Sequence, residues 1–124
     1  MGLVVGPAAS VIHVRAGEWK VAFGVQAFLG QDIHHATLGI LGMGRIGQAI
    51  ARRAAGFDMR ITYHNRARRA EADERRLGAA GVGRDRLLAE SDFVVVMAPY
   101  SPANHHMIGA AELAQMKPTA ILVN

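Results

Sequence analysis

Residues 37–47 read Thr-Leu-Gly-Ile-Leu-Gly-Met-Gly-Arg-Ile-Gly, and this stretch decides the fold. A short apolar run at 38–41 predicts a strand. The glycine pattern G-x-G-x-x-G follows at once, at 42–47. The residues after it, 48–55, predict a helix. A strand, a glycine-rich turn and a helix in this order are typical of a site that binds a dinucleotide.

The helix is predicted from apolar residues that recur on one helical face. These residues are Ile46, Ala49, Ile50 and Ala54. Gly56 follows at the place where a glycine often ends a helix, so we expect the helix to stop there.

Each glycine of the motif is expected to have its own role. Gly42 permits the tight turn out of the strand, and Gly44 has no Cβ, so the backbone can approach a pyrophosphate. Gly47 lets the helix pack closely on the strand. The helix N-terminus then offers unpaired N–H groups and a positive dipole end to the phosphates. A glycine-rich turn without a ligand is the alternative, and the flanking strand and helix argue against it.

The choice of dinucleotide depends on the residue that ends the next strand, predicted at 59–64. A carboxylate in this place binds the ribose 2′-hydroxyl of NAD. Here the place is held by Asn65, and Arg66 and Arg68 follow. Guanidinium groups pair with phosphate through charge-assisted bonds, so this loop favours NADP(H) over NAD(H). The alternative is that Arg66 to Arg76 form a solvated helix face, and we prefer this interpretation for Arg75 and Arg76.

Composition excludes several classes of protein. With 124 residues, 51% hydrophobic content and 4 Pro, the chain is expected to fold with a modest core. The absence of cysteine excludes disulfides and fits a cytoplasmic location. No apolar stretch reaches the length of a membrane span. The net charge is +4, but arginines alternate with acids and aromatic residues are few, so we do not expect nucleic-acid binding.

Strands and helices are predicted to alternate along the chain. After the motif come a strand at 59–64, a charged helix near 68–77, a glycine-rich turn at 78–83 and a short helix at 86–90. The β-branched run at 93–97 predicts a strand buried on both faces. A helix at 110–116 and a strand at 120–123 complete the series, and residues 1–16 are also expected to be helical. This alternation predicts an α/β fold with a doubly wound parallel sheet.

Histidines provide no metal site in this reading. His34-His35 and His105-His106 are adjacent pairs, and neighbouring residues of a helix or strand point to different sides. No H-E-x-x-H pattern and no Ser-His-Asp arrangement is present. We therefore expect no metal site and no catalytic residue within these residues.

Three blocks of the sequence together resemble the D-isomer-specific 2-hydroxyacid dehydrogenases, and within them the glyoxylate/hydroxypyruvate reductase branch. They are residues 37–48, residues 89–95 and residues 110–124, which read Ala-Ala-Glu-Leu-Ala-Gln-Met-Lys-Pro-Thr-Ala-Ile-Leu-Val-Asn. The resemblance implies a Rossmann-type NAD(P)-binding domain. It implies cofactor contacts from the glycine loop, including Met43, Arg45 and Ile46, and from the end of the second strand at Asn65.

The same resemblance assigns the loop after the strand at 93–97 to the nicotinamide half of the cofactor. These residues are Ala98, Pro99 and Tyr100, and Tyr100-Ser101 departs mildly from the family's usual Leu-Thr. Residues 1–20 resemble the helix that leads from the family's substrate domain, and residues 21–124 resemble a cofactor domain that is incomplete at its C-terminal end.

The family's substrate-binding Arg, its Glu and its general-acid His would all follow Asn124. We therefore expect a piece of an oxidoreductase that reduces a small 2-oxo acid, such as glyoxylate or hydroxypyruvate, to the 2-hydroxy acid. The piece is expected to carry cofactor binding but not the catalytic set. A homodimer is implied by the resemblance alone. The alternatives are a non-catalytic dinucleotide-binding or regulatory module, and a structural piece that binds nothing.

Overall fold

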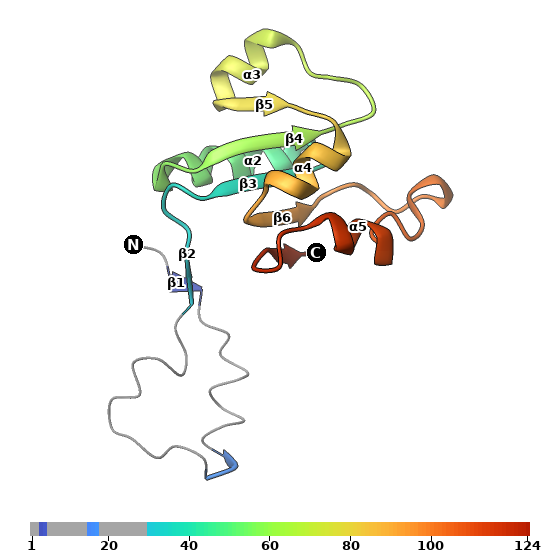
Figure 1. The fold of residues 1–124 in the computed structure, drawn as a ribbon. Helices are drawn as coiled ribbons and strands as arrows, with labels where there is room; N and C mark the ends of the chain where they lie inside the picture. The colour runs from blue at the N-terminus through green and yellow to red at the C-terminus, as the bar shows by residue number, and fades with distance from the viewer. Residues whose placement is uncertain (1–2, 5–14, 18–29) are drawn as a thin grey trace. The chain divides into compact units, whose positions relative to one another are not determined.

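The computed structural model describes residues 3–4, 15–17 and 30–124 (Figure 1). The chain divides into two compact units, Met1–His34 and His35–Asn124. The division into a linking helix at 1–20 and a cofactor domain at 21–124 stays a prediction. In the first unit, strand β1 (Leu3–Val4) pairs antiparallel with β2 (Gln31–Asp32).

The helix predicted for residues 1–16 is therefore wrong at Leu3 and Val4. Backbone pairing with β2 gives these two residues the partners that a helix would otherwise have supplied. The rest of the predicted linking helix at 1–20, apart from 15–17, lies outside the described residues.

The second unit is a five-stranded sheet, with strand order β5-β4-β3-β6-β7 and every pairing parallel. Its elements are β3 Thr37–Leu41, α2 Arg45–Ala54, η1 Ala55–Phe57, β4 Arg60–His64, α3 Glu71–Leu77, β5 Ala79–Gly81, α4 Arg84–Glu90, β6 Phe93–Val96, η2 Pro102–Asn104, α5 Ala110–Gln115 and β7 Ile121–Val123. The predicted α/β class with a parallel sheet is confirmed, and the ends of most predicted elements shift by no more than a few residues.

The core is built on the central strand β3, whose five residues are all buried. Such a strand, covered on both faces, is what a continuous apolar run predicts. One core cluster joins Leu41 of β3 and Val94 of β6 to Leu87 and Leu88 of α4. These contacts hold α4 against the sheet at Leu41, the residue that precedes the glycine turn.

Helix α2 buries a face that matches the predicted one only at Ala54. Its buried residues are Gly47, Ala51 and Ala54, whereas Ile46 is 67% exposed. The close approach of the helix to β3 leaves room only for small side chains, so the larger isoleucine points away. Gly56 does not end the helix as predicted, because it lies within η1 and the left-handed residue that follows is Asp58, at φ 52°.

Residues 78–83 contain a strand where only a turn was predicted. Ala79–Gly81 forms β5, which pairs with β4 at the edge of the sheet. Small residues such as these carry no strand signal of their own, so the pairing with β4 decides the conformation.

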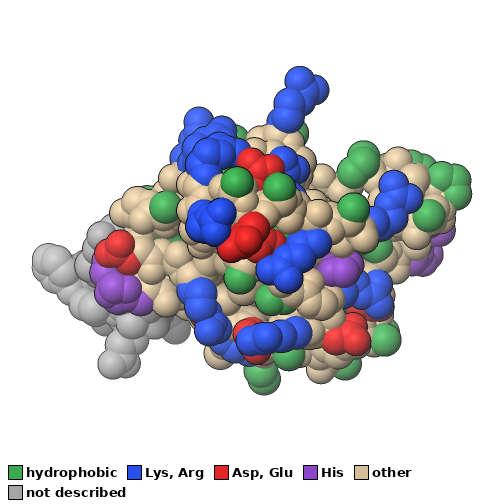
Figure 2. All heavy atoms as spheres, turned by 90° about the horizontal axis from the view of Figure 1, so that it is seen from above, with side chains coloured by type: hydrophobic (Ala, Val, Ile, Leu, Met, Phe, Trp, Pro, Cys, Tyr) green, Lys and Arg blue, Asp and Glu red, His purple; other side chains and the backbone are tan. Residues whose placement is uncertain are grey.

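Helix α3 carries the charges that the sequence placed on a solvated face. Arg75 pairs with Glu71 at 2.6 Å, and Arg76 pairs with Asp73 at 3.0 Å. Figure 2, which views the molecule from above, shows Lys or Arg side chains intermixed with Asp and Glu side chains on this face. The interpretation of Arg75 and Arg76 as surface residues is consistent with these pairs. None of the described helices is long and apolar enough to cross a membrane.

Candidate functional site

A cleft of about 840 Å³ opens at the carboxyl ends of β3, β4 and β6. After β3 the chain runs through β4 to β5 on one side, then returns to place β6 on the other side. Ligands of such sheets bind at this reversal of direction. The residues that line the cleft are Leu41, Gly42, Met43, Gly44, His64, Asn65, Arg66, Ala67, Arg69, Arg84, Met97, Ala98, Pro99, Ser101, Ala103, Asn104, His105, His106 and Met107.

The glycine turn has the geometry that the motif requires. Gly42 has φ +105°, and a Cβ there would lie 2.7 Å from the backbone nitrogen of Ala98. A Cβ at Gly47 would collide with the Gly42 carbonyl oxygen, which agrees with the predicted packing role. Gly44 is the N-cap of α2, and a Cβ there would meet nothing within 4 Å. Gly44 therefore faces open space at the helix N-terminus, where a phosphate would bind.

The loop after β4 is bonded directly to the glycine turn. Met43 is fully buried, and its N–H donates to Asn65 Oδ1 at 2.7 Å. The Met43 carbonyl accepts a hydrogen bond from Arg69 Nη1 at 3.3 Å. Asn65 uses its acceptor on the turn, so its amide NH₂, a donor, remains for a ligand.

Arg68 has a different partner from the one predicted. Its Nε and Nη2 both donate to the Glu74 carboxylate at 2.8 Å, and it is not among the residues that line the cleft. Glu74 also accepts a bond from the Tyr63 hydroxyl at 2.7 Å. These bonds, that from Arg68 first, hold the pKa of Glu74 at about 2, below its ordinary 4.5. Burial, together with Glu74, raises the pKa of Tyr63.

Arg69, which the sequence reading did not single out, reaches the cleft instead. Its Nη2 pairs with Asp73 at 2.8 Å, and the side chain is only 29% exposed. Its Nε is buried and has no hydrogen-bond partner among the described residues. Two consecutive arginines thus point to different surroundings, and sequence alone carries no signal that would tell them apart.

The cleft brings together seven of the twelve residues predicted to bind the cofactor. They are Gly42, Met43, Gly44, Asn65, Arg66, Ala98 and Pro99. The other five do not line it, and they are Arg45, Ile46, Gly47, Arg68 and Tyr100. Arg45 and Ile46 are exposed in the first turn of α2, and Tyr100 is 80% exposed beside the cleft residues Pro99 and Ser101.

The charged side chains that line the described cleft are basic. Of the described residues, those that line it include Arg66, Arg69 and Arg84 but no aspartate or glutamate. Arg84 binds Glu112 of α5 at 3.0 Å. His64 Nδ1 lies 3.1 Å from the Val82 carbonyl. A concave site with an excess of arginine is suited to an anionic ligand.

Two further histidines, His105 and His106, line the cleft with ring centroids 3.8 Å apart. They follow η2 and were not predicted from the sequence to be among the cofactor-binding residues. The position of Arg84, at the start of a helix that follows a different strand, could not be connected to this site from sequence.

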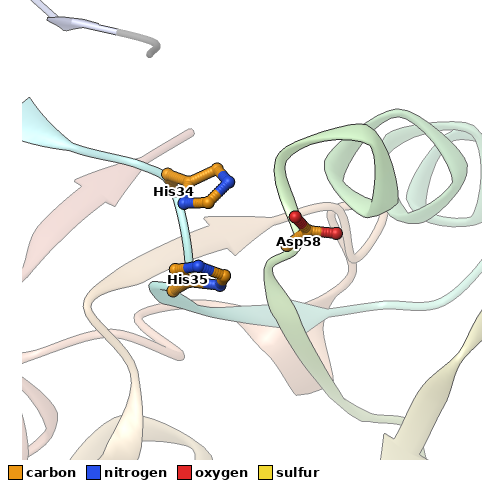
Figure 3. A group of neighbouring side chains, drawn as sticks. All are labelled: His34, His35 and Asp58. Atoms are coloured by element: carbon orange, nitrogen blue, oxygen red, sulfur yellow. The ribbon is translucent and has the colours of Figure 1, made fainter.

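His34, His35 and Asp58 form a group of another kind (Figure 3). The two histidines lie in a turn, and His35 has φ 61°. The rule that neighbours on a helix or strand point apart therefore does not apply to this pair. His34 belongs to the first compact unit, whereas His35 and Asp58 belong to the second. The group spans that boundary, so we assign it no metal.

Comparison with known proteins identifies the family. Residues 6–124 match the D-isomer specific 2-hydroxyacid dehydrogenase, NAD binding domain. The chain is 55% identical to a glyoxylate reductase of Thermococcus onnurineus (strain NA1) over 90% of its own length and 34% of the relative's. It is 52% identical to a glyoxylate/hydroxypyruvate reductase B of Pectobacterium atrosepticum, over 92% of this chain and 35% of that protein.

Comparison with solved structures gives the same result as comparison with sequences. A glyoxylate reductase from Paecilomyes thermophila superposes with a TM-score of 0.77 at 44% identity, over 92% of this chain and 33% of that one. D-lactate dehydrogenase from Escherichia coli gives a TM-score of 0.78 at 28% identity, over 94% of this chain and 36% of that one. The chain thus spans about a third of the length of the relatives it matches. It belongs to the D-isomer specific 2-hydroxyacid dehydrogenase family, within its NAD binding domain, and its class of cofactor is a nicotinamide dinucleotide.

Proposed function

We propose that this chain is the NADP(H)-binding part of an oxidoreductase that reduces a small 2-oxo acid of the glyoxylate or hydroxypyruvate kind. The observation that carries the cofactor choice is the cleft itself, which combines Arg66 and Arg69 with the Asn65 amide and has no carboxylate among its described lining residues. The substrate class rests on the glyoxylate and hydroxypyruvate reductases among the relatives.

The groups present fit a phosphorylated dinucleotide. The open space at Gly44 and the N-terminus of α2 suit the pyrophosphate. Arg66 is exposed, and both Arg66 and Arg69 line the cleft, so their guanidinium groups can donate to a 2′-phosphate. A carboxylate at position 65 would repel this phosphate, whereas an amide can donate to it.

Arg68 has no direct part in this proposal, because its guanidinium is bound to Glu74. Arg45, Ile46, Ala98, Pro99 and Tyr100 stay proposed contacts to the pyrophosphate and the nicotinamide half, and Gly47 supports the turn through packing.

The bound cofactor supplies the hydride for the reduction. The residues of this chain bind and orient it. The glycine turn fixes the pyrophosphate, and the loop after β6, which approaches the turn at Ala98, is the wall against which the nicotinamide half would lie. On the family resemblance, we extend the proposal to a cytoplasmic enzyme that forms a homodimer, which sedimentation equilibrium can test.

Replacement of Gly44 tests the site. A valine there should abolish measurable binding of NADPH and NADH, because its side chain occupies the space of the pyrophosphate. The backbone at Gly44 has φ −78° and a Cβ meets nothing within 4 Å, so the variant should fold. Calorimetric titration of both proteins measures the result.

Gly56→Val is the matched control, since a Cβ at Gly56 also meets nothing within 4 Å and this residue does not line the cleft. It should bind both cofactors like the parent. Undiminished binding by a folded Gly44→Val variant would remove the glycine turn from the site and overturn the proposal.

A further inference from the structure

The loop between β4 and α3 is anchored to a buried tyrosine. Tyr63 is 1% exposed, and its hydroxyl donates to Glu74 at 2.7 Å and accepts the backbone N–H of Arg69 at 2.9 Å. Glu74, in turn, binds the guanidinium of Arg68 through two bonds of 2.8 Å. Residues 68 and 69 are thus held to one point, the first through its side chain and the second through its backbone.

This anchor decides which way the two arginines point. With Arg68 bound to Glu74 on one side, Arg69 extends to the Met43 carbonyl and to Asp73 on the other, and it lines the cleft. Arg66 lies in the same short loop, between the anchor and the Asn65–Met43 bond. The segment that presents both cleft arginines is therefore fixed at each end.

Strand β5 lies next to the Tyr63 hydroxyl. A Cβ at Gly81 of β5 would lie 3.0 Å from this hydroxyl and 2.8 Å from Glu74 Oε1. The edge strand therefore packs tightly over the pair. Such a packed network holds a single arrangement of the loop, and a loop ordered before binding loses less conformational freedom when it binds.

We propose that Tyr63 and Glu74 are positioning residues for cofactor choice, which set the loop so that Arg66 and Arg69 face the 2′-phosphate of NADP(H). The inference rests on the proposed preference for NADP(H). Tyr63 and Glu74, and Arg68 through its bonds to Glu74, thus affect cofactor choice without contacting the cofactor. NAD(H) lacks the 2′-phosphate, so its binding should not depend on the loop's arrangement.

Tyr63→Phe is the direct test, because it deletes only the hydroxyl. Its dissociation constant for NADPH should rise by roughly fivefold to tenfold, while that for NADH changes by less than about twofold. Thr62→Val is the matched control, since it removes a neighbouring buried hydroxyl of β4 that bonds to the Leu38 carbonyl, at 3.5 Å. This control should leave the ratio of the two constants unchanged.

Arg68→Ala is the second variant, and it keeps the test valid if Tyr63→Phe does not fold. The Arg68 side chain is 69% exposed, so its loss should be tolerated, and NADPH affinity should again fall selectively. Arg75→Ala removes the same charge from a 70% exposed side chain of α3 that is bonded to Glu71 instead, and it should keep the parent's ratio.

The outcomes separate the two proposals. A parent that binds NADPH and NADH equally overturns the proposed preference and this inference with it. A parent that prefers NADPH, with the same ratio in Tyr63→Phe or Arg68→Ala, overturns only the positioning role. Parallel weakening of both cofactors, with a lower melting temperature, would likewise show that the network merely stabilises the fold. A selective loss for NADPH in both variants supports the inference.

Discussion

Gly39 lies in β3 where helix α4 covers the sheet. A Cβ there would lie 2.6 Å from Leu87 Cδ2 and closer still to Ser91 Oγ, and both of these side chains are fully buried. We expect Gly39→Ala to lower the free energy of unfolding by about 1–3 kcal/mol, since a packed core must move to admit the methyl group. Urea unfolding measures this effect.

Gly83→Ala is the control for this substitution. Gly83 is the N-cap of α4, with φ −64°, and a Cβ meets nothing within 4 Å. Its unfolding midpoint should change little. An equal midpoint for Gly39→Ala and the parent would mean that α4 shifts freely on the sheet.

Asn65 and Arg66 are the residues at which cofactor choice can be reversed. An aspartate at 65 can accept the Met43 N–H with one oxygen and a ribose hydroxyl with the other, and it repels a 2′-phosphate. Asn65→Asp combined with Arg66→Ala should therefore bind NADH more tightly than NADPH, with a shift of about tenfold or more.

Dissociation constants for both cofactors at low and high salt test this reversal. The parent's preference should shrink as salt rises, because Arg66 is exposed and its attraction to phosphate is screened. If the double variant keeps the parent's order of affinity, the choice of cofactor does not reside in this loop.

Among the elements, α3 is attached to the sheet partly through a charged side chain, because Glu74 bonds to Tyr63 of β4. Glu74, on its buried side, has a pKa of about 2 because it binds Arg68 and Tyr63, whereas its ordinary value is 4.5. A carboxylate with a lowered pKa in the folded state adds stability above its unfolded pKa and loses that stability as the pH falls towards the folded value.

The stability that comes from the Glu74 charge should therefore be complete above pH 5 and disappear between about pH 4.5 and pH 2. Glu74→Gln should melt below the parent at pH 7, and the difference should narrow across that window. Melting followed by circular dichroism over this pH range checks it, with Glu71→Gln, an exposed pair on the same helix, as the control. A constant difference between parent and variant would assign the effect to packing instead of charge.

Elements with a strong local pattern were predictable, and those formed by partners were not. The run Phe93–Val96 predicts β6 because β-branched residues favour a buried strand. Ala79–Gly81 has no such pattern, and only its pairing with β4 makes it β5. The buried face of α2 was predicted correctly only at Ala54, because helical spacing fits both the isoleucines and the small residues, and the close contact with β3 selects the small ones.

For the candidate site, the sequence predicts the backbone motif better than it predicts the directions of the side chains. The glycine turn follows from local steric needs, which sequence displays directly. The bond between Met43 and Asn65 joins residues 22 positions apart, so it depends on the sheet register that brings β3 and β4 together. The different directions of Arg68 and Arg69 depend on the buried Tyr63, which no local pattern indicates.

At the scale of the whole molecule, cofactor binding should be separable from catalytic turnover. Residues 1–124 produced alone should bind NADPH yet show no reduction of glyoxylate or hydroxypyruvate above a buffer blank. Reduction requires a carboxylate anchor and a proton donor beside the nicotinamide. The family resemblance places both outside these residues, and the chain covers about a third of its relatives' length.

The Thermococcus onnurineus glyoxylate reductase is the positive control for the assay. Turnover by the pure 124-residue protein would contradict the prediction and assign the proton donor to a histidine of the cleft, which His64→Ala and His106→Ala would then identify.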